Sequence, residues 1–177
     1  MSAPRDFNAD LAMSNQPDVV AGVVAAIRHY IPEVLNVIQA HKQNDMIGVD
    51  YWLEFAGGRM ETVDVKVRQD DYSLRGDDRT ACLELVANIG TGKAGWSVDP
   101  DKRTDWIIFY YIETGKSFGY HARQLRSAVN RFLPELEAKG KASVQKTGRY
   151  ESKSLFVSHK ELGKAIYLNS QNTTAHQ

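Results

Sequence analysis

The chain has little of what marks secreted, membrane or zinc-binding proteins. Its single cysteine, Cys82, excludes an internal disulfide and a cysteine-based metal site. Its five histidines are scattered without zinc-ligand spacing. No apolar run approaches the length of a membrane span, and the first residues lack a signal-peptide core. We therefore expect a cytoplasmic protein without a membrane partner.

The composition has no extreme of hydrophobicity or charge. Of the 177 residues, 42% are hydrophobic and 25% are charged, which is typical of globular chains and disfavours disorder. This length suits one domain with a sizeable core. We expect that domain to span residues 17–168, between flexible tails at residues 1–16 and 169–177.

A β-hairpin is the most informative pattern in the sequence. One strand is predicted over Asp50–Phe55 and a second over Met60–Arg68, with Gly57 and Gly58 forming the turn between them. Residues of a strand point alternately to its two faces. The second strand therefore predicts one apolar face that enters a core and one polar face.

The two faces of the second strand carry different chemistry. Val63, Val65 and Val67 share one face, whereas Asp64 and Lys66 share the other. Asp50 joins them from the neighbouring strand. Two carboxylates and a lysine held by rigid strands can bind a hard cation such as Mg²⁺ through oxygen ligands and position a water beside it.

The segment from Asp50 to Asp64-Val65-Lys66 resembles the PD-(D/E)XK, or restriction-endonuclease-like, nuclease superfamily. In that superfamily an acidic residue begins one strand and a D/E-X-K triplet lies on the next. The resemblance covers roughly residues 18–120. The chain departs from the pattern at Val49, where the superfamily often has proline.

The resemblance implies a hydrolase that cleaves phosphodiester bonds with Mg²⁺, for which Mn²⁺ can substitute. Asp50, Asp64 and the main-chain carbonyl of Val65 would hold the metal. Lys66 would orient the attacking water and stabilise charge in the transition state. We expect a structure-selective or weakly sequence-specific endonuclease acting on DNA, or alternatively RNA; this small size is compatible with a homodimer.

The remaining pattern predicts an α/β fold with a mixed central sheet flanked by helices, restriction-endonuclease-like in its arrangement. The helix before the hairpin begins at Pro17, and Pro32 separates it from a second helical piece over residues 34–38. The other predicted elements are strands at Thr80–Ala87, Asp105–Ile112, Ser117–His121 and Leu155–Val157, helices at Ala122–Phe132 and His159–Tyr167, and a basic loop over residues 141–153. If the strand at Thr80–Ala87 lies next to Met60–Arg68, Glu84 could join the acidic cluster or hold Lys66 in place.

Three further acidic residues are candidates for an additional ligand. Glu84 lies in a mainly apolar strand, where it either joins the carboxylates or faces water at a sheet edge. Glu33 follows Pro32 in a predicted first helical turn, where a carboxylate also favours the helix dipole. Asp45 lies in the linker before the hairpin, where it is a candidate ligand or an ordinary turn former.

Charge is distributed unevenly along the chain. Residues 1–100 contain 9 Lys and Arg against 15 Asp and Glu, and residues 101–177 contain 13 against 7. This asymmetry suits a metal site beside a phosphate-binding surface, although chance segregation on a solvated surface produces the same counts. The candidate nucleic-acid contacts are Lys93, Arg123, Arg126, Lys146 and Arg149.

A second interpretation is a non-catalytic protein on the same fold that binds DNA or a protein partner, such as a phage or defence accessory factor. In that case Lys66 would form an ordinary ion pair with Asp64 or Glu84. Such a pair contributes little energetically when it is exposed.

Overall fold

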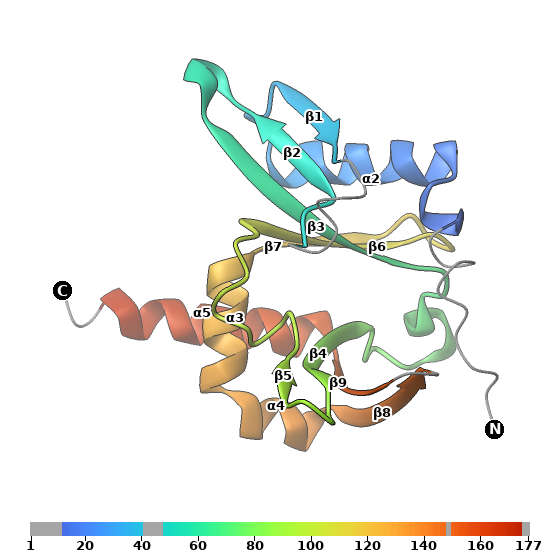
Figure 1. Cartoon of the computed structure of the whole chain (residues 1–177), viewed down its shortest axis with the longest axis vertical. Coiled ribbons are helices and arrows are strands. Elements are labelled where there is room, and N and C mark those ends of the chain that lie inside the picture. The colour runs from blue at the N-terminus through green and yellow to red at the C-terminus, as the bar shows by residue number, and fades with distance from the viewer. Residues whose placement is uncertain (1–11, 41–47, 148–149, 175–177) are drawn as a thin grey trace. The chain divides into compact units, whose positions relative to one another are not determined.

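The structure is a computed structural model that describes residues 12–40, 48–147 and 150–174. Its contacts divide the chain into two compact units (Figure 1). The five-stranded unit comprises the described residues up to 71 together with residues 102–122, and the four-stranded unit comprises residues 72–101 and 123–174. The domain predicted over residues 17–168 spans both units.

The five-stranded unit contains the helix α2 and a mixed sheet in the order β1-β2-β3-β6-β7. β3 and β6 are parallel, and the other neighbouring pairs are antiparallel. This sheet and its helix confirm the predicted α/β class. The elements are α2 (Pro17–Tyr30), β1 (Asn36–Gln39), β2 (Tyr51–Glu54), β3 (Met60–Arg68), β6 (Trp106–Tyr111) and β7 (Ser117–His121), with a 3₁₀ turn, η2, at Ala56–Gly58.

The apolar face of β3 forms a core with α2, as its alternation predicts. Val63 is fully buried, and Val65 and Val67 pack against the same cluster. From α2, Val23 and Ile27 enter this cluster, one helical turn apart. Asp64 and Lys66 therefore lie on the face of β3 that is opposite to α2.

The predicted hairpin forms with its turn at the predicted glycines. Gly57 and Gly58 have φ values of 77° and 79°, a region that side chains with a β-carbon rarely adopt. The register pairs Tyr51 with Val63, and Glu54 with Met60. Because this register continues by one residue, Asp50, immediately before β2, lies beside β3 near Asp64.

The predicted helical piece at residues 34–38 is wrong, because this segment forms the edge strand β1. Val37 and Ile38 are β-branched residues that suit a strand. The main-chain N–H of Leu35 donates to the carbonyl of Glu54 at 2.8 Å and leads the segment into the sheet. The apolar residues of this short segment, Val34, Leu35, Val37 and Ile38, fit the periodicity of a helix or of a strand, which is why the pattern was ambiguous.

The four-stranded unit contains an antiparallel sheet in the order β5-β4-β9-β8 and three helices. The strands are β4 (Ala81–Asn88), β5 (Lys93–Ala94), β8 (Lys141–Thr147) and β9 (Tyr150–Val157). The helices are α3 (Ala122–Arg131), α4 (Leu133–Lys139) and α5 (His159–Thr174), with a 3₁₀ turn, η3, at Tyr72–Arg75.

The strand predicted at residues 80–87 forms β4, but it pairs with β9 and β5, and the neighbours of β3 are β2 and β6. The condition under which Glu84 would join the carboxylates is thus not met. Two predictions about this unit are wrong. The basic loop predicted over residues 141–153 forms β8 and the first half of β9. The last helix continues past Tyr167 to Thr174, and Asn169 is buried and donates to Ser127 Oγ at 3.0 Å.

No helix in the described part of the chain has both the length and the apolar character that a membrane span requires.

Candidate functional site

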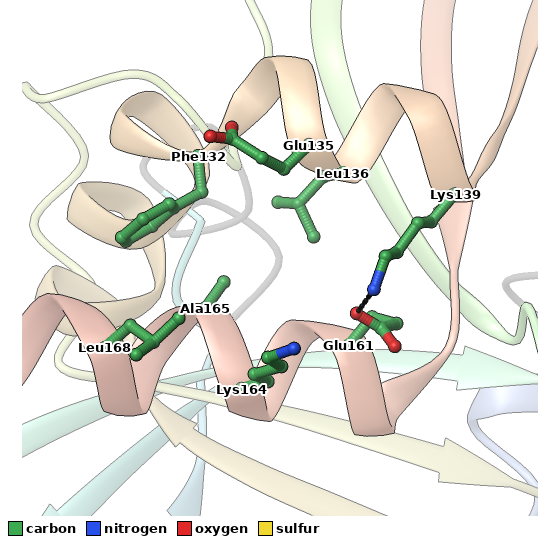
Figure 2. Close-up of a pocket in the computed structure, with 8 residues that line it drawn as sticks. All are labelled: Phe132, Glu135, Leu136, Lys139, Glu161, Lys164, Ala165 and Leu168. Carbon is green, nitrogen blue, oxygen red and sulfur yellow. Dashed lines mark hydrogen bonds and ion pairs between the residues drawn. The ribbon is translucent and has the colours of Figure 1, made fainter.

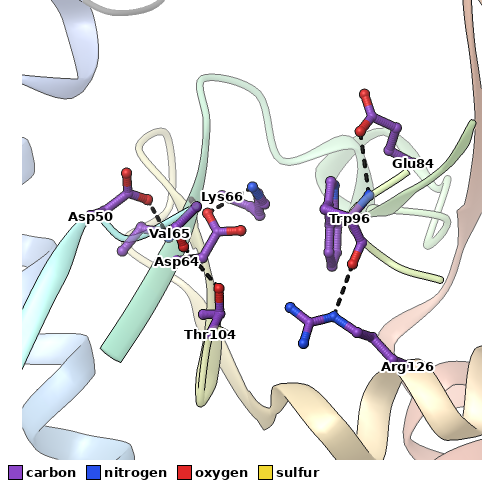
Figure 3. Close-up of polar contacts among 9 residues, drawn as sticks. Asp50, Asp64, Val65, Lys66, Glu84, Trp96, Thr104 and Arg126 are labelled. Atoms are coloured by element: carbon purple, nitrogen blue, oxygen red, sulfur yellow. Dashed lines mark hydrogen bonds and ion pairs between the residues drawn. The ribbon is translucent and has the colours of Figure 1, made fainter. Parts of the chain in front are cut away.

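Asp50 extends the β2–β3 ladder with its side chain. Its main-chain N–H donates to the carbonyl of Val63 at 2.8 Å, and its Oδ2 accepts the N–H of Val65 at 2.6 Å (Figure 3). Residues two apart on a strand direct their main-chain groups toward the same edge. The carbonyl of Val65 therefore faces the edge of β3 on which Asp50 lies.

Asp64 and Lys66 share one face of β3, as predicted. Asp64 is 5% exposed, and its Oδ1 accepts a hydrogen bond from Lys66 Nζ at 2.7 Å. The Lys66 side chain is 21% exposed. The pair is thus largely shielded from water, and the ammonium lies directly against one oxygen of the carboxylate.

The two carboxyl groups interact strongly. Burial, and secondly the negative charge of Asp64, raise the pKa of Asp50 from 3.8 to about 7, against the lowering effects of the Val65 N–H and the Lys66 ammonium. Burial and the Asp50 charge also raise the pKa of Tyr51. The folded protein therefore favours the protonated form of the Asp50 carboxyl.

A divalent cation would fit the chemistry of this pair. Two adjacent carboxylates and a main-chain carbonyl on one strand edge are hard oxygen donors, and Mg²⁺ keeps several of its waters when it binds to so few protein ligands. Among the residues that the structure describes, no group of three or more His, Cys, Asp or Glu side chains could hold a metal. The described residues thus offer two carboxylates for such a site, those of Asp50 and Asp64.

A small cavity gives access to Asp50. Its volume is about 140 Å³, and polar residues before α2 and on β1 form part of its wall. Gln39 Nε2 donates to Asn15 Oδ1 at 3.2 Å across this wall. Asn15 lies in the segment predicted as a flexible tail, and no sequence pattern indicated that it lines this cavity. The lining residues are Ser14, Asn15, Val23, Gln39, Asp50, Tyr51, Val65 and Val67.

Thr104 fixes the segment that carries Asp50, a role that the sequence did not reveal. Its hydroxyl donates to the carbonyl of Gly48 at 2.8 Å, and its side chain is buried (Figure 3). Gly48 has a φ of 74°, which a residue with a β-carbon adopts only under strain. The only sequence signal for Thr104 was its position just before the most apolar strand.

The Thr104→Val variant should lose about 1 kcal/mol of unfolding free energy, because the partly buried Gly48 carbonyl loses its donor while the side-chain shape is retained. Its affinity for Mg²⁺ should fall several-fold as the segment of Asp50 loosens. Chemical denaturation and calorimetric titration measure the two effects. Thr91→Val, at an exposed position, should change neither quantity; equal behaviour of the two variants would contradict this role of Thr104.

Glu84 lies in β4, which pairs with β9 and β5 and not with β3. Its Oε2 accepts the main-chain N–H of Trp96 at 3.4 Å (Figure 3). The strand pairing that would bring it to the carboxylates is therefore absent, and its role as an accessory ligand stays a prediction. Glu33 is exposed in the turn after α2. Asp45 and His41 lie outside the described residues.

The predicted nucleic-acid contacts differ in accessibility. Lys93 and Arg123 are exposed. Arg126 is 6% exposed and its Nε donates to the carbonyl of Trp96 at 3.0 Å, so its side chain is largely withdrawn from solvent. Lys146 is exposed and its Nζ lies 2.8 Å from Glu151 Oε1. Arg149 lies outside the described residues.

Charge also segregates between the two units, about as strongly as along the sequence. Residues 6–71 and 102–122, which include the five-stranded sheet, contain 8 Lys and Arg against 13 Asp and Glu. The rest of the chain contains 14 against 9. The carboxylate pair thus belongs to the acidic unit, and the exposed cations predicted to contact phosphate belong to the basic one.

A second cavity, of about 230 Å³, lies between α4 and α5 (Figure 2). Leu136, Ala165 and Leu168 give it an apolar lining. At its rim, Lys139 Nζ lies 2.7 Å from Glu161 Oε2, and this contact lowers the pKa of Glu161. The opposite charges of Lys139 and Glu161 thus offset one another, whereas Asp50 and Asp64 place two acidic groups next to each other.

Comparison of the chain with protein-family models, curated proteins and solved structures finds no match. The functional assignment therefore depends on the geometry and the electrostatics of Asp50, Asp64 and Lys66.

Proposed function

We propose that this protein is a metal-dependent nuclease of the PD-(D/E)XK, restriction-endonuclease-like type, which hydrolyses phosphodiester bonds in DNA. The observation that carries the proposal is the placement of the Asp50 carboxyl beside the buried Asp64 carboxylate and Lys66, where burial and the Asp64 charge raise the pKa of Asp50 and a divalent cation would favour the ionised pair. Further support comes from the order of the elements: a helix that covers one sheet face, an acidic residue before one strand, and the Asp-Val-Lys triplet on the next.

The residues that would hold Mg²⁺, or Mn²⁺ in its place, are Asp50, Asp64 and Val65 through its carbonyl. The bound ion would polarise the phosphodiester and lower the pKa of a coordinated water. Asp64 would bind the ion through its carboxylate, which also accepts a hydrogen bond from Lys66. The ammonium of Lys66, mostly shielded from water, would stabilise the negative charge that grows on the phosphate oxygens in the transition state.

In this reaction the oxygen of water forms a bond to phosphorus, and one of the two ester P–O bonds breaks. The proton of the water ends on the departing sugar oxygen, so the products are a phosphate monoester and an alcohol. The buried carboxylates and the lysine are built into paired strands. Their positions are thus fixed before substrate arrives, which lowers the cost of reorganisation.

The exposed Lys93 and Arg123 would contact the phosphate backbone, without reading the sequence. Their unit carries the excess of positive charge that such contacts require. Lys146 would contribute less, because Glu151 offsets its charge. This arrangement favours a structure-selective or weakly sequence-specific enzyme.

The 2.7 Å contact between Asp64 and Lys66 also favours a second candidate, a non-catalytic protein that binds DNA or a protein partner. In that protein the contact is a structural ion pair. Nicking of supercoiled plasmid in the presence of Mg²⁺ distinguishes the two candidates, because a structural ion pair gives no cleavage.

The Lys66→Gln variant tests the proposed catalytic role. We expect its nicking rate to fall by roughly 10²-fold or more, as when a charge-stabilising donor is removed from other active sites. Its Mg²⁺ affinity should be equal or higher, because a cation that competes for Asp64 is gone. Lys160→Gln, at an exposed position of α5, serves as the control. An active wild type with an equally active Lys66→Gln variant would remove Lys66 from the mechanism.

A further inference from the structure

The cavity beside Asp50 adjoins the candidate metal site across β3. Val65 and Val67 line it, and they alternate along the strand with Asp64 and Lys66, whose side chains point to the other face. Asp50 also lines the cavity, and its Oδ2 accepts the Val65 N–H at the edge of β3. Asp50 thus belongs both to the wall of this cavity and to the carboxylate pair.

The size and the walls of the cavity suit one flat ring. Its volume of about 140 Å³ is close to that of the apolar cavities of about 150 Å³ that bind one benzene molecule in another protein. Val23 and Tyr51, which also line it, are 1% and 5% exposed, so packing holds these walls in place. Apolar walls of this kind contact the faces of an aromatic or heteroaromatic ring.

A carboxamide supplies hydrogen-bonding groups to the same cavity. Gln39 Nε2 donates to Asn15 Oδ1 at 3.2 Å, and both residues are exposed where they line the cavity. This bond uses one of the two N–H groups of Gln39 and leaves the other N–H and the carbonyl oxygen, Oε1. A donor and an acceptor on one amide are what Asn and Gln present when they pair with the edge of a nucleobase.

We propose that this cavity binds an unpaired pyrimidine base of a DNA single strand, next to the phosphodiester that the metal would hold. The inference rests on the proposed nuclease function and deepens it by naming the substrate class. Gln39 would pair with the edge of the base, and Val65 and Val67 would contact its ring. A pyrimidine has one six-membered ring, whereas the fused rings of a purine need more room.

This assignment defines which DNA the enzyme would cleave. A base in a duplex is stacked and paired, and it enters a protein cavity only after it leaves the stack. The substrate is therefore a single strand, or a duplex that carries an unpaired segment. One nucleotide connects its base to its phosphate, so Asp50 would lie between the bound base and the bound phosphate.

The first test measures binding without metal, so it does not depend on cleavage. Fluorescence anisotropy gives dissociation constants for a single-stranded oligodeoxythymidylate, an oligodeoxyadenylate of equal length and an abasic strand with the same backbone. The wild type should bind the thymidylate roughly fivefold or more tightly than either of the others. Gln39→Leu should reduce this preference to about twofold or less, because it removes the donor and the acceptor at similar size. Gln69→Leu, at an exposed position after β3, should keep the preference of the wild type.

A second variant closes the cavity from another wall. Val67→Phe fills the space that the ring would occupy, and thermal unfolding verifies that the variant is folded. Its preference for the thymidylate should disappear, whereas its affinity for the abasic strand should stay within about twofold of wild type, because that strand is bound through its phosphates.

The outcomes separate the base site from the nuclease function. A wild type that nicks DNA in Mg²⁺ but binds the thymidylate no better than the abasic strand, or binds the adenylate best, would overturn the base site alone. A preference that survives in both Gln39→Leu and folded Val67→Phe would also overturn it. A preference that both variants lose, in a protein that cleaves no DNA in Mg²⁺, would support the base site and overturn the nuclease function.

Discussion

Hydrolysis by the Asp64→Asn variant should be at least about 10³-fold slower than by the wild type in Mg²⁺, because the substitution removes half of the carboxylate charge that would hold the metal. The same carboxylate accepts a hydrogen bond from Lys66 Nζ. One substitution thus disturbs the metal site and the lysine together. Plasmid nicking under single-turnover conditions measures the loss.

Two opposing effects on stability accompany this substitution. The Lys66 ammonium loses a charged partner in a largely buried position, which is destabilising. Asp50 loses the neighbouring negative charge that helps to raise its pKa, which is stabilising. Thermal unfolding should therefore show a folded variant. Asp101→Asn, at an exposed carboxylate, should retain full activity; equal activity in Asp64→Asn would eliminate the proposed centre.

In the metal-free protein, the free energy of unfolding should fall as the pH rises from about 4 to 7. The folded protein keeps the Asp50 carboxyl protonated up to about pH 7, whereas the unfolded chain releases that proton near 3.8. In this window the unfolded state binds fewer protons, so stability decreases by about 1.4 kcal/mol per pH unit from this group. The total is on the order of 4 kcal/mol, and the curve flattens above pH 7.

Asp50→Asn isolates the contribution of this one carboxyl group. An asparagine at this position retains an oxygen that can accept the Val65 N–H, but it does not titrate. Urea denaturation between pH 4 and 8 should show that the unfolding free energy of the wild type decreases with rising pH relative to that of the variant. Parallel curves would show that Asp50 titrates in its ordinary range. With saturating Mg²⁺ the wild-type decrease should become smaller, because the ion favours the ionised carboxylate.

The sequence predicted the hairpin because its determinants are local. Strict alternation over Val63–Val67 defines the two faces of β3, and two adjacent glycines define the turn. The proximity of Asp50, Asp64 and Lys66 follows from that hairpin. These three residues could therefore be proposed before any tertiary contact was known.

Long-range strand pairing was beyond the sequence pattern. β4 pairs with β9, about seventy positions further along the chain, and its apolar face would suit a place beside β3 equally well. The polar strand β8 gains its ladder bonds at a sheet edge, where side chains need not be apolar, so its composition indicated a loop. Such pairings depend on the whole chain.

The contacts around Gly48 could not be predicted for the same reason. The bond from Thr104 to Gly48 joins residues 56 positions apart. Lys102 and Arg103 look alike in the sequence, and only the fold shows that the first is partly buried beside Asp64 whereas the second is exposed. The hairpin determines which side chains can form a pair, and the distant loop determines what surrounds that pair.

Calorimetric titration of Mg²⁺ into the wild type and into Asp64→Asn at pH 7 tests the central claim most directly. We predict one site in the wild type, with release of a proton from Asp50 on binding, and no measurable binding in the variant. Identical titrations of the two proteins, or no binding to either, would contradict a metal centre at Asp50 and Asp64.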